Sequence, residues 1–137
     1  MARLYRLAVA SNIPVIAVVD DESPVRTMLC RVLRLADYQV TAFASGEEFL
    51  DSLTARLPAC AILDVHMPGL SGLDVQSRMR AAHIEVPVVF ITASDDLALD
   101  RLALEAGGVC LLRKPFSSDE LLAAVDAALR SKSCEAS

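Results

Sequence analysis

The sequence predicts a single α/β domain in which five parallel strands carry helices on both faces of the sheet. Short runs of valine, isoleucine and leucine alternate with longer segments that carry apolar residues at helical spacing. Four of the runs stop at polar side chains: residues 15–19 at Asp20 and Asp21, 60–63 at Asp64, 86–91 at Thr92, and 109–112 just before Lys114. Because ligands bind beyond the carboxyl ends of parallel strands, these positions predict a site.

The first half of the chain predicts two strand–helix units. After the strand at 15–19, Ser23 can cap a helix that has Pro24 at its first position. An apolar stripe then follows at helical spacing, made of Val25, Leu29, Val32, Leu33 and Ala36. Residues 40–43 suit the second strand, and the Ser-Gly-Glu-Glu segment at 45–48 has the spacing of a capping box before a short helix.

The second half predicts three more units. The strand at 60–63 leads into a helix over about 72–82, and the strand at 86–91 leads into a helix that ends at Gly107 or Gly108. The strand at 109–112 precedes a capping box at 117–120 and a last helix. Right-handed crossovers then predict a flavodoxin-like (βα)5 three-layer sandwich with strand order 2-1-3-4-5.

Composition agrees with one domain of this kind. The chain has 137 residues, of which 54% are hydrophobic, and this is enough for a full core. We expect an N-terminal extension at 1–13, the domain at 14–130, and a polar tail or the start of a linker at 131–137. The net charge of −5 disfavours nonspecific binding to nucleic acid, and no apolar run approaches the length of a membrane span.

The cysteines indicate a reducing compartment. Cys30, Cys60, Cys110 and Cys134 are scattered, without the paired spacing or the nearby histidine of a zinc site. The first three fall on apolar segments, which favours buried, reduced thiols over disulfides.

The strand-end acids predict a cation site. Asp20, Asp21 and Asp64 cannot all be ionised within a few ångströms of one another at neutral pH unless a cation compensates them. A few hard oxygen ligands with room for water suit Mg²⁺ better than zinc or a caged calcium. Taken alone, the acid pair would be explained as turn and helix-capping residues. Convergence from two strand ends, with Lys114 arriving from a third, makes the site the better explanation.

Asp64 is the candidate for covalent chemistry. A carboxylate can attack a phosphoryl group to form an acyl phosphate, and the transfer needs mainly charge stabilisation around the moving group. Lys114 and the Thr92 hydroxyl could each contact a phosphoryl oxygen, although each alone would be an ordinary strand-end residue. The Lys114–Pro115 bond could be cis, but local sequence favours trans.

These motifs together resemble the receiver domain of bacterial two-component response regulators. The resemblance rests on the acids at 20–21, Asp-Val-His-Met-Pro-Gly-Leu-Ser-Gly-Leu at 64–73, Thr-Ala at 92–93 and Lys-Pro-Phe at 114–116. It covers about residues 14–130. Segments 41–50 and 105–109 are most similar to the FixJ-type (LuxR/NarL-class) branch, whose receivers usually precede a helix-turn-helix DNA-binding domain.

The resemblance implies a cytoplasmic phosphoacceptor protein rather than an enzyme, in which Asp64 takes a phosphoryl group from a histidine of a sensor kinase. It implies Mg²⁺, with Mn²⁺ as a substitute, held by Asp20 or Asp21, by Asp64 and by the backbone carbonyl of His66. Thr92 would be the switch hydroxyl and Lys114 the phosphate-binding cation.

The resemblance also implies a cis peptide at Lys114–Pro115 and a homodimer surface within residues 95–130. Contact with DNA would require an effector domain that this sequence does not contain. The chain is then either a stand-alone receiver or a fragment of a larger regulator. Residues 97, 99, 102 and 104 are leucines, which indicates either a widely buried helix or a contact surface.

One position departs from the family pattern. Three residues before the lysine, where receivers usually carry tyrosine or phenylalanine, this chain has Leu111. This keeps open a pseudo-receiver that signals without phosphate turnover. A phosphohydrolase of the haloacid dehalogenase type is a second alternative, but it needs an acid two residues after the nucleophile, where this chain has His66.

Overall fold

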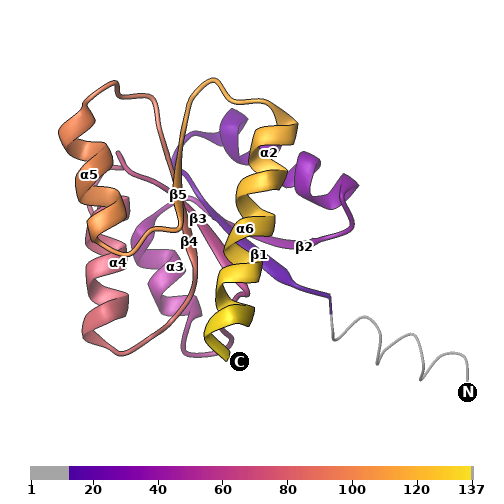
Figure 1. Ribbon diagram of the computed structural model, residues 1–137, viewed down its shortest axis with the longest axis horizontal. Helices are drawn as coiled ribbons and strands as arrows, with labels where there is room; N and C mark the ends of the chain where they lie inside the picture. Colours follow the sequence, from indigo (N-terminus) through magenta and orange to yellow (C-terminus); the bar gives the residue numbers. More distant parts are fainter. Residues whose placement is uncertain (1–12, 137) are drawn as a thin grey trace, which may run out of the picture.

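The computed structural model describes residues 13–136 as a sheet between two layers of helices (Figure 1). The predicted alternation of strands and helices is confirmed throughout this range. In chain order the elements are β1 (Val15–Val19), α2 (Ser23–Leu35), β2 (Gln39–Phe43), α3 (Gly46–Ser52), β3 (Cys60–Asp64), α4 (Gly72–Ala81), β4 (Val88–Thr92), α5 (Leu97–Glu105), β5 (Cys110–Arg113) and α6 (Ser118–Ala136).

The sheet has five parallel strands in the order β2-β1-β3-β4-β5, which confirms the predicted topology. Helices α2 and α6 cover one face, and α3, α4 and α5 cover the other (Figure 1). Successive strand residues alternate between the two cores, so that Ile16 and Val18 face α2 while Ala17 and Val19 face α3. Both faces of the central strands are therefore buried, as their continuous apolar runs predict.

Side-chain caps begin most of the helices. Ser71 and Asp74 form a reciprocal capping box before α4, and Ser117 and Glu120 form the same pair of hydrogen bonds before α6. The expectation that Ser23 caps α2 is wrong, because Ser23 already lies in the helix and Glu22 occupies the N-cap position without a side-chain cap. The backbone N–H of Glu22 instead donates to the Asp20 carboxylate at 2.8 Å.

The last helix is longer than the polar composition at its end suggests. Helix α6 continues to Ala136, since each residue added to an existing helix gains one backbone hydrogen bond. The domain boundary near residue 130 stays a prediction, and most of the expected extension at 1–13 lies outside the described residues. Within residues 13–136, no helix is both long and apolar enough to cross a membrane.

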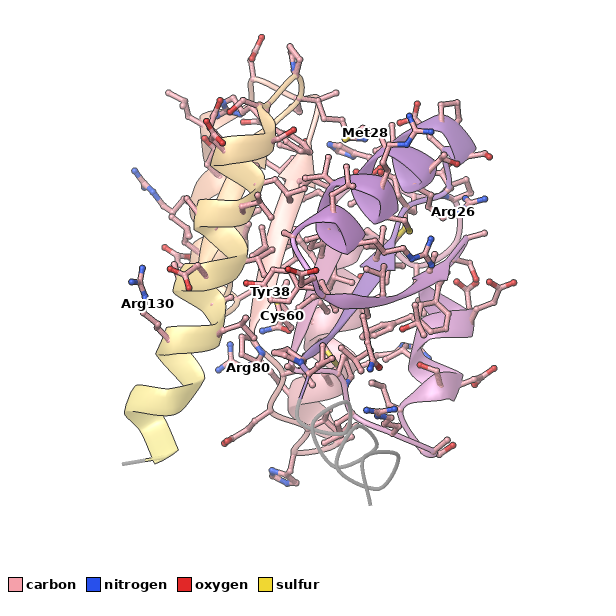
Figure 2. The ribbon with its side chains drawn as sticks, turned by 90° about the vertical axis from the view of Figure 1, so that its right-hand side faces the viewer. Arg26, Met28, Tyr38, Cys60, Arg80 and Arg130 are labelled. Carbon is pink, nitrogen blue, oxygen red and sulfur yellow. The ribbon has the colours of Figure 1, made fainter. Side chains whose placement is uncertain are left out.

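The cysteines of the core are free thiols, as predicted. Cys30 and Cys60 are buried and Cys110 is half-buried. Figure 2 labels Cys60 and Tyr38, which belong to the core between the sheet and helices α2 and α6. Burial and the neighbouring Cys110 thiol raise the pKa of Cys60 to about 12, so this thiol is protonated and unreactive.

Helix α5 buries few of its apolar side chains against the domain. Ala103 is its only buried residue, whereas Leu97, Leu102 and Leu104 are 76%, 53% and 51% exposed. The explanation of a widely buried helix is therefore wrong for these three leucines. They are large apolar side chains of α5 that remain exposed on the domain.

Candidate functional site

Strand pairing brings the predicted acids together at the carboxyl edge of the sheet. Val19 of β1 is in register with Leu63 of β3, so the residues that follow them, Asp20 and Asp64, are neighbours. Oxygen atoms of Asp20, Asp21 and Asp64 lie within 4.8 Å of one another. Asp20 is fully buried and Asp64 is 3% exposed, while Asp21 faces solvent.

Lys114 joins the two buried acids. Its ammonium nitrogen lies 3.3 Å from a carboxylate oxygen of Asp20 and 3.3 Å from one of Asp64. A third ion pair, at 3.2 Å, links it to Glu22. The lysine therefore supplies the positive charge that compensates this group of acids in the structure, as the convergence of three strand ends predicts.

The remaining oxygens of the two acids accept hydrogen bonds from nearby backbone. One Asp64 oxygen accepts from the N–H of His66 at 3.2 Å, and one Asp20 oxygen accepts from Glu22. The Asp20 carbonyl accepts from the Arg26 guanidinium at 2.8 Å; Figure 2 labels this arginine on α2. These contacts orient both carboxylates before any ligand binds.

Burial perturbs the charged groups of the site. Burial and the nearby Asp20 charge raise the pKa of Asp64 from 3.8 to about 6, although Lys114 and the His66 N–H partly oppose the rise. Burial disfavours the Lys114 ammonium, but the negative charges of Asp64 and Asp20 outweigh it and raise the lysine pKa. The site thus holds a carboxylate whose charge is incompletely compensated.

Thr92 ends β4 beside these acids and is fully buried. Its hydroxyl oxygen accepts a hydrogen bond from the N–H of Ser94 at 3.1 Å, and its carbonyl accepts from the N–H of Lys114 at 2.8 Å. Leu111 lies on β5 in register with Phe90 and is half-buried against the core formed with α3, α4 and α5. The two predicted switch residues therefore lie on adjacent strands.

The loop after Asp64 is shaped by two glycines. Gly69 has a φ of 76°, a value that L side chains rarely adopt. A Cβ on Gly72 would lie 2.5 Å from the Asp64 carbonyl oxygen, so only glycine lets the start of α4 approach the strand end this closely. The His66 side chain is exposed, and the Lys114–Pro115 bond is cis, as the resemblance implies.

Sequence reasoning missed three participants around the site: Glu22, Arg26 and Arg113. Glu22 could have been suspected because it continues the acidic run at 20–21. Nothing local indicates that Arg26 reaches the Asp20 carbonyl, or that Arg113 reaches the carbonyl of Ser94 at 2.6 Å. The Arg113 contact requires elements that meet only in the folded chain, whereas Arg26 lies six residues after Asp20 but carries no sequence signal for this contact.

The donor set fits a hard divalent cation. Carboxylate oxygens from two adjacent strand ends converge, one of the acids is open to solvent, and neither thiol nor imidazole takes part in the cluster. One of these acids, Asp64, is buried and pairs with Lys114, and Thr92 ends the next strand at the same edge of the sheet. This combination can bind and neutralise a phosphoryl group.

Comparison with known proteins gives a consistent result. Residues 16–126 match the family model of the response regulator receiver domain. Nodulation protein W of Bradyrhizobium diazoefficiens is 40% identical over 119 residues, which cover 87% of this chain and 52% of that protein. The transcriptional regulatory protein FixJ of the same organism is 36% identical over 115 residues, covering 84% of this chain and 56% of FixJ.

Comparison with solved structures also finds receiver domains. A response regulator receiver protein from Burkholderia phymatum superposes with a TM-score of 0.76 at 44% identity, covering 85% of this chain and 94% of that one. The chain spans about half the length of the two curated relatives. The family match, the strand order and the placement of the acids lead to one conclusion: the chain belongs to the response regulator receiver domain family of two-component signalling.

Proposed function

We propose that Asp64 accepts a phosphoryl group from a phosphohistidine of a sensor kinase and that the domain responds as a conformational switch. The observation that carries this proposal is the state of Asp64 itself. It is a nearly buried carboxylate, flanked by two further acids, with a lysine ammonium 3.3 Å away. A structural salt bridge would not need three acids at two neighbouring strand ends.

The chain's own residues have distinct tasks in this proposal. Asp64 forms a P–O bond as the P–N bond to the kinase histidine breaks. Lys114 leaves part of its contact with the acids to neutralise a phosphoryl oxygen, and the Thr92 hydroxyl donates to another. Mg²⁺, with Mn²⁺ as a substitute, would be held by Asp20, Asp21, Asp64 and the carbonyl of His66, and would supply positive charge to the transferring group.

Partners follow from the family. We expect a sensor histidine kinase as the phosphoryl donor in the cytoplasm, where the free thiols of the core would remain reduced. DNA would be contacted only through an effector domain of the kind present in regulators such as FixJ. The exposed leucines of α5 support a homodimer surface within residues 95–130.

Intact mass measurement tests the proposal. The protein is incubated with acetyl phosphate and Mg²⁺, and a gain of one phosphoryl group is expected for wild type but not for Asp64→Asn. Asp51→Asn is the matched control, because Asp51 is an exposed acid on α3, away from the site. Labelling of the Asp64 variant would refute the assignment, and absence of labelling in wild type would favour a pseudo-receiver.

A further inference from the structure

A continuous set of polar contacts leads from Thr92 to helix α5. The Thr92 hydroxyl oxygen accepts from the N–H of Ser94 at 3.1 Å, and the carbonyl of Ser94 accepts from the Arg113 guanidinium at 2.6 Å. The same guanidinium forms an ion pair with Asp100 in the first turn of α5. Arg113 is also the register partner of Thr92 across β4 and β5.

The two ends of α5 are held in different ways. At its carboxyl end, the side chains of Gln76 and Arg80 both donate to the Ala106 carbonyl at 3.0 Å and fasten the helix to α4. At its amino end, the helix is linked to the sheet by the ion pair between Asp100 and Arg113 of β5. Among the hydrogen bonds and ion pairs of the described residues, this is the side-chain contact that joins the two. Only the amino end is therefore connected to the Thr92 loop.

This link is incompletely satisfied. Within the described residues, the second carboxylate oxygen of Asp100 is buried and accepts no hydrogen bond, which costs free energy for a carboxylate. Most of α5 adds little apolar burial, because Leu97, Leu102 and Leu104 are exposed. The amino end of α5 is consequently held by a polar contact that a modest perturbation can release.

We propose that Arg113 is a positioning residue that holds the Thr92 loop and the amino end of α5 in the unphosphorylated arrangement. The inference rests on the proposed function, since it assigns Thr92 to the phosphoryl group. When the Thr92 hydroxyl moves towards a phosphoryl oxygen, Ser94 moves with it and its carbonyl leaves Arg113. The pair with Asp100 then loosens, and the amino end of α5 is released while the Ala106 end stays fastened to α4.

Because coupling between two sites is reciprocal, removing this link should favour binding of the phosphoryl group. The probe is beryllofluoride with Mg²⁺, titrated against the full chain and followed by amide chemical shifts. Arg113→Gln should bind beryllofluoride about two- to fivefold more tightly, the range expected for loss of a partly exposed ion pair. Asp100→Asn should change affinity in the same direction but by less, because asparagine can still accept from the guanidinium.

Hydrogen exchange without beryllofluoride gives a second, independent readout. Amides 98–102 should exchange faster in Arg113→Gln than in wild type, whereas amides 106–108 should be unchanged. In wild type, beryllofluoride should produce the same pattern. Arg101→Gln and Glu105→Gln are matched controls on exposed positions of α5 and should leave both readouts unaltered.

The outcomes separate this inference from the proposed function. Unchanged or weaker beryllofluoride binding by Arg113→Gln, with wild-type binding intact, would overturn the inference alone. Failure of wild type to bind the probe would overturn the proposed function, and the exchange rates of amides 98–102 in the free variants would still decide whether Arg113 holds α5. Equal exchange in wild type and Arg113→Gln would show that it does not.

Discussion

Asp64→Asn should stabilise the protein in the absence of metal. Asp64 ionises at a nearly buried position beside Asp20, and Lys114 compensates this charge only in part. Asparagine resembles the protonated carboxyl in shape and removes the charge. The variant should therefore unfold at higher denaturant concentration than wild type near neutral pH, even though it loses its ability to be phosphorylated.

The magnitude follows from the pKa of Asp64. A rise from 3.8 to about 6 corresponds, at about 1.4 kcal/mol per unit, to about 3 kcal/mol as an upper value. Since the pKa is higher in the folded state, the destabilisation is fully present above about pH 6 and disappears as the pH falls from there towards 3.8. We expect a measured stabilisation of about 1–3 kcal/mol. The value lies below the upper limit because relaxation of the Asp64 side chain and its loop in wild type reduces the cost of the charge.

Urea denaturation in the presence of EDTA, followed by far-UV circular dichroism, measures this difference. The free energy of unfolding is compared for wild type, Asp64→Asn and the exposed control Asp51→Asn at about pH 7.5 and about pH 5, where the advantage of Asp64→Asn should shrink to roughly half. If Asp64→Asn were equal to or less stable than wild type at the higher pH, with a neutral control, burial and repulsion would not be what perturbs Asp64.

Three further predictions concern the same edge of the sheet. Mg²⁺ should raise the melting temperature of wild type by binding the folded state, and Asp20→Asn should reduce this increase; an equal increase in both would exclude Asp20 as a ligand. Leu111→Phe should shift the equilibrium between the inactive and the active conformation about two- to tenfold towards the active one, because a ring buries more area than leucine. The amide shifts of residues 94–130 on beryllofluoride binding should therefore be larger, with Mg²⁺ affinity unchanged; identical responses would show that leucine serves equally well. Gly72→Ala should lower the free energy of unfolding by about 1–3 kcal/mol in urea denaturation, because its Cβ would lie 2.5 Å from the Asp64 carbonyl oxygen; an unchanged value would mean that α4 shifts without strain.

Local patterns were sufficient for most of the fold. Apolar runs ended by turn residues located the strands, and the capping boxes at 45–48 and 117–120 located the starts of α3 and α6, because these preferences act within a few residues. The start of α2 was misjudged at Ser23. The backbone N–H of Glu22 donates to the Asp20 carboxylate, and Ser23 does not cap the helix with its hydroxyl. The polar end of α6 also gave no sign that the helix continues to Ala136.

The composition of the site was predictable for a topological reason. All strands of a parallel sheet end at the same edge, so residues that follow separate apolar runs are brought together whatever the details of packing. Asp20, Asp64, Thr92 and Lys114 could therefore be grouped from the order of the elements alone. The resemblance to receivers added the kinase histidine as the expected phosphoryl donor, the switch role expected of Thr92, and the cis bond at Lys114–Pro115, which local preference disfavoured.

Tertiary packing decided which partners these groups find. Lys114 reaches Asp20 across 94 residues of sequence and Asp64 across 50, and its third partner, Glu22, belongs to a loop whose path depends on Asp20. The Arg113 contacts with Ser94 and Asp100, and the exposure of the α5 leucines, likewise depend on how α5 lies against β5. Periodicity shows which residues can face a core, but burial and ion pairing depend on the elements that arrive from distant parts of the chain.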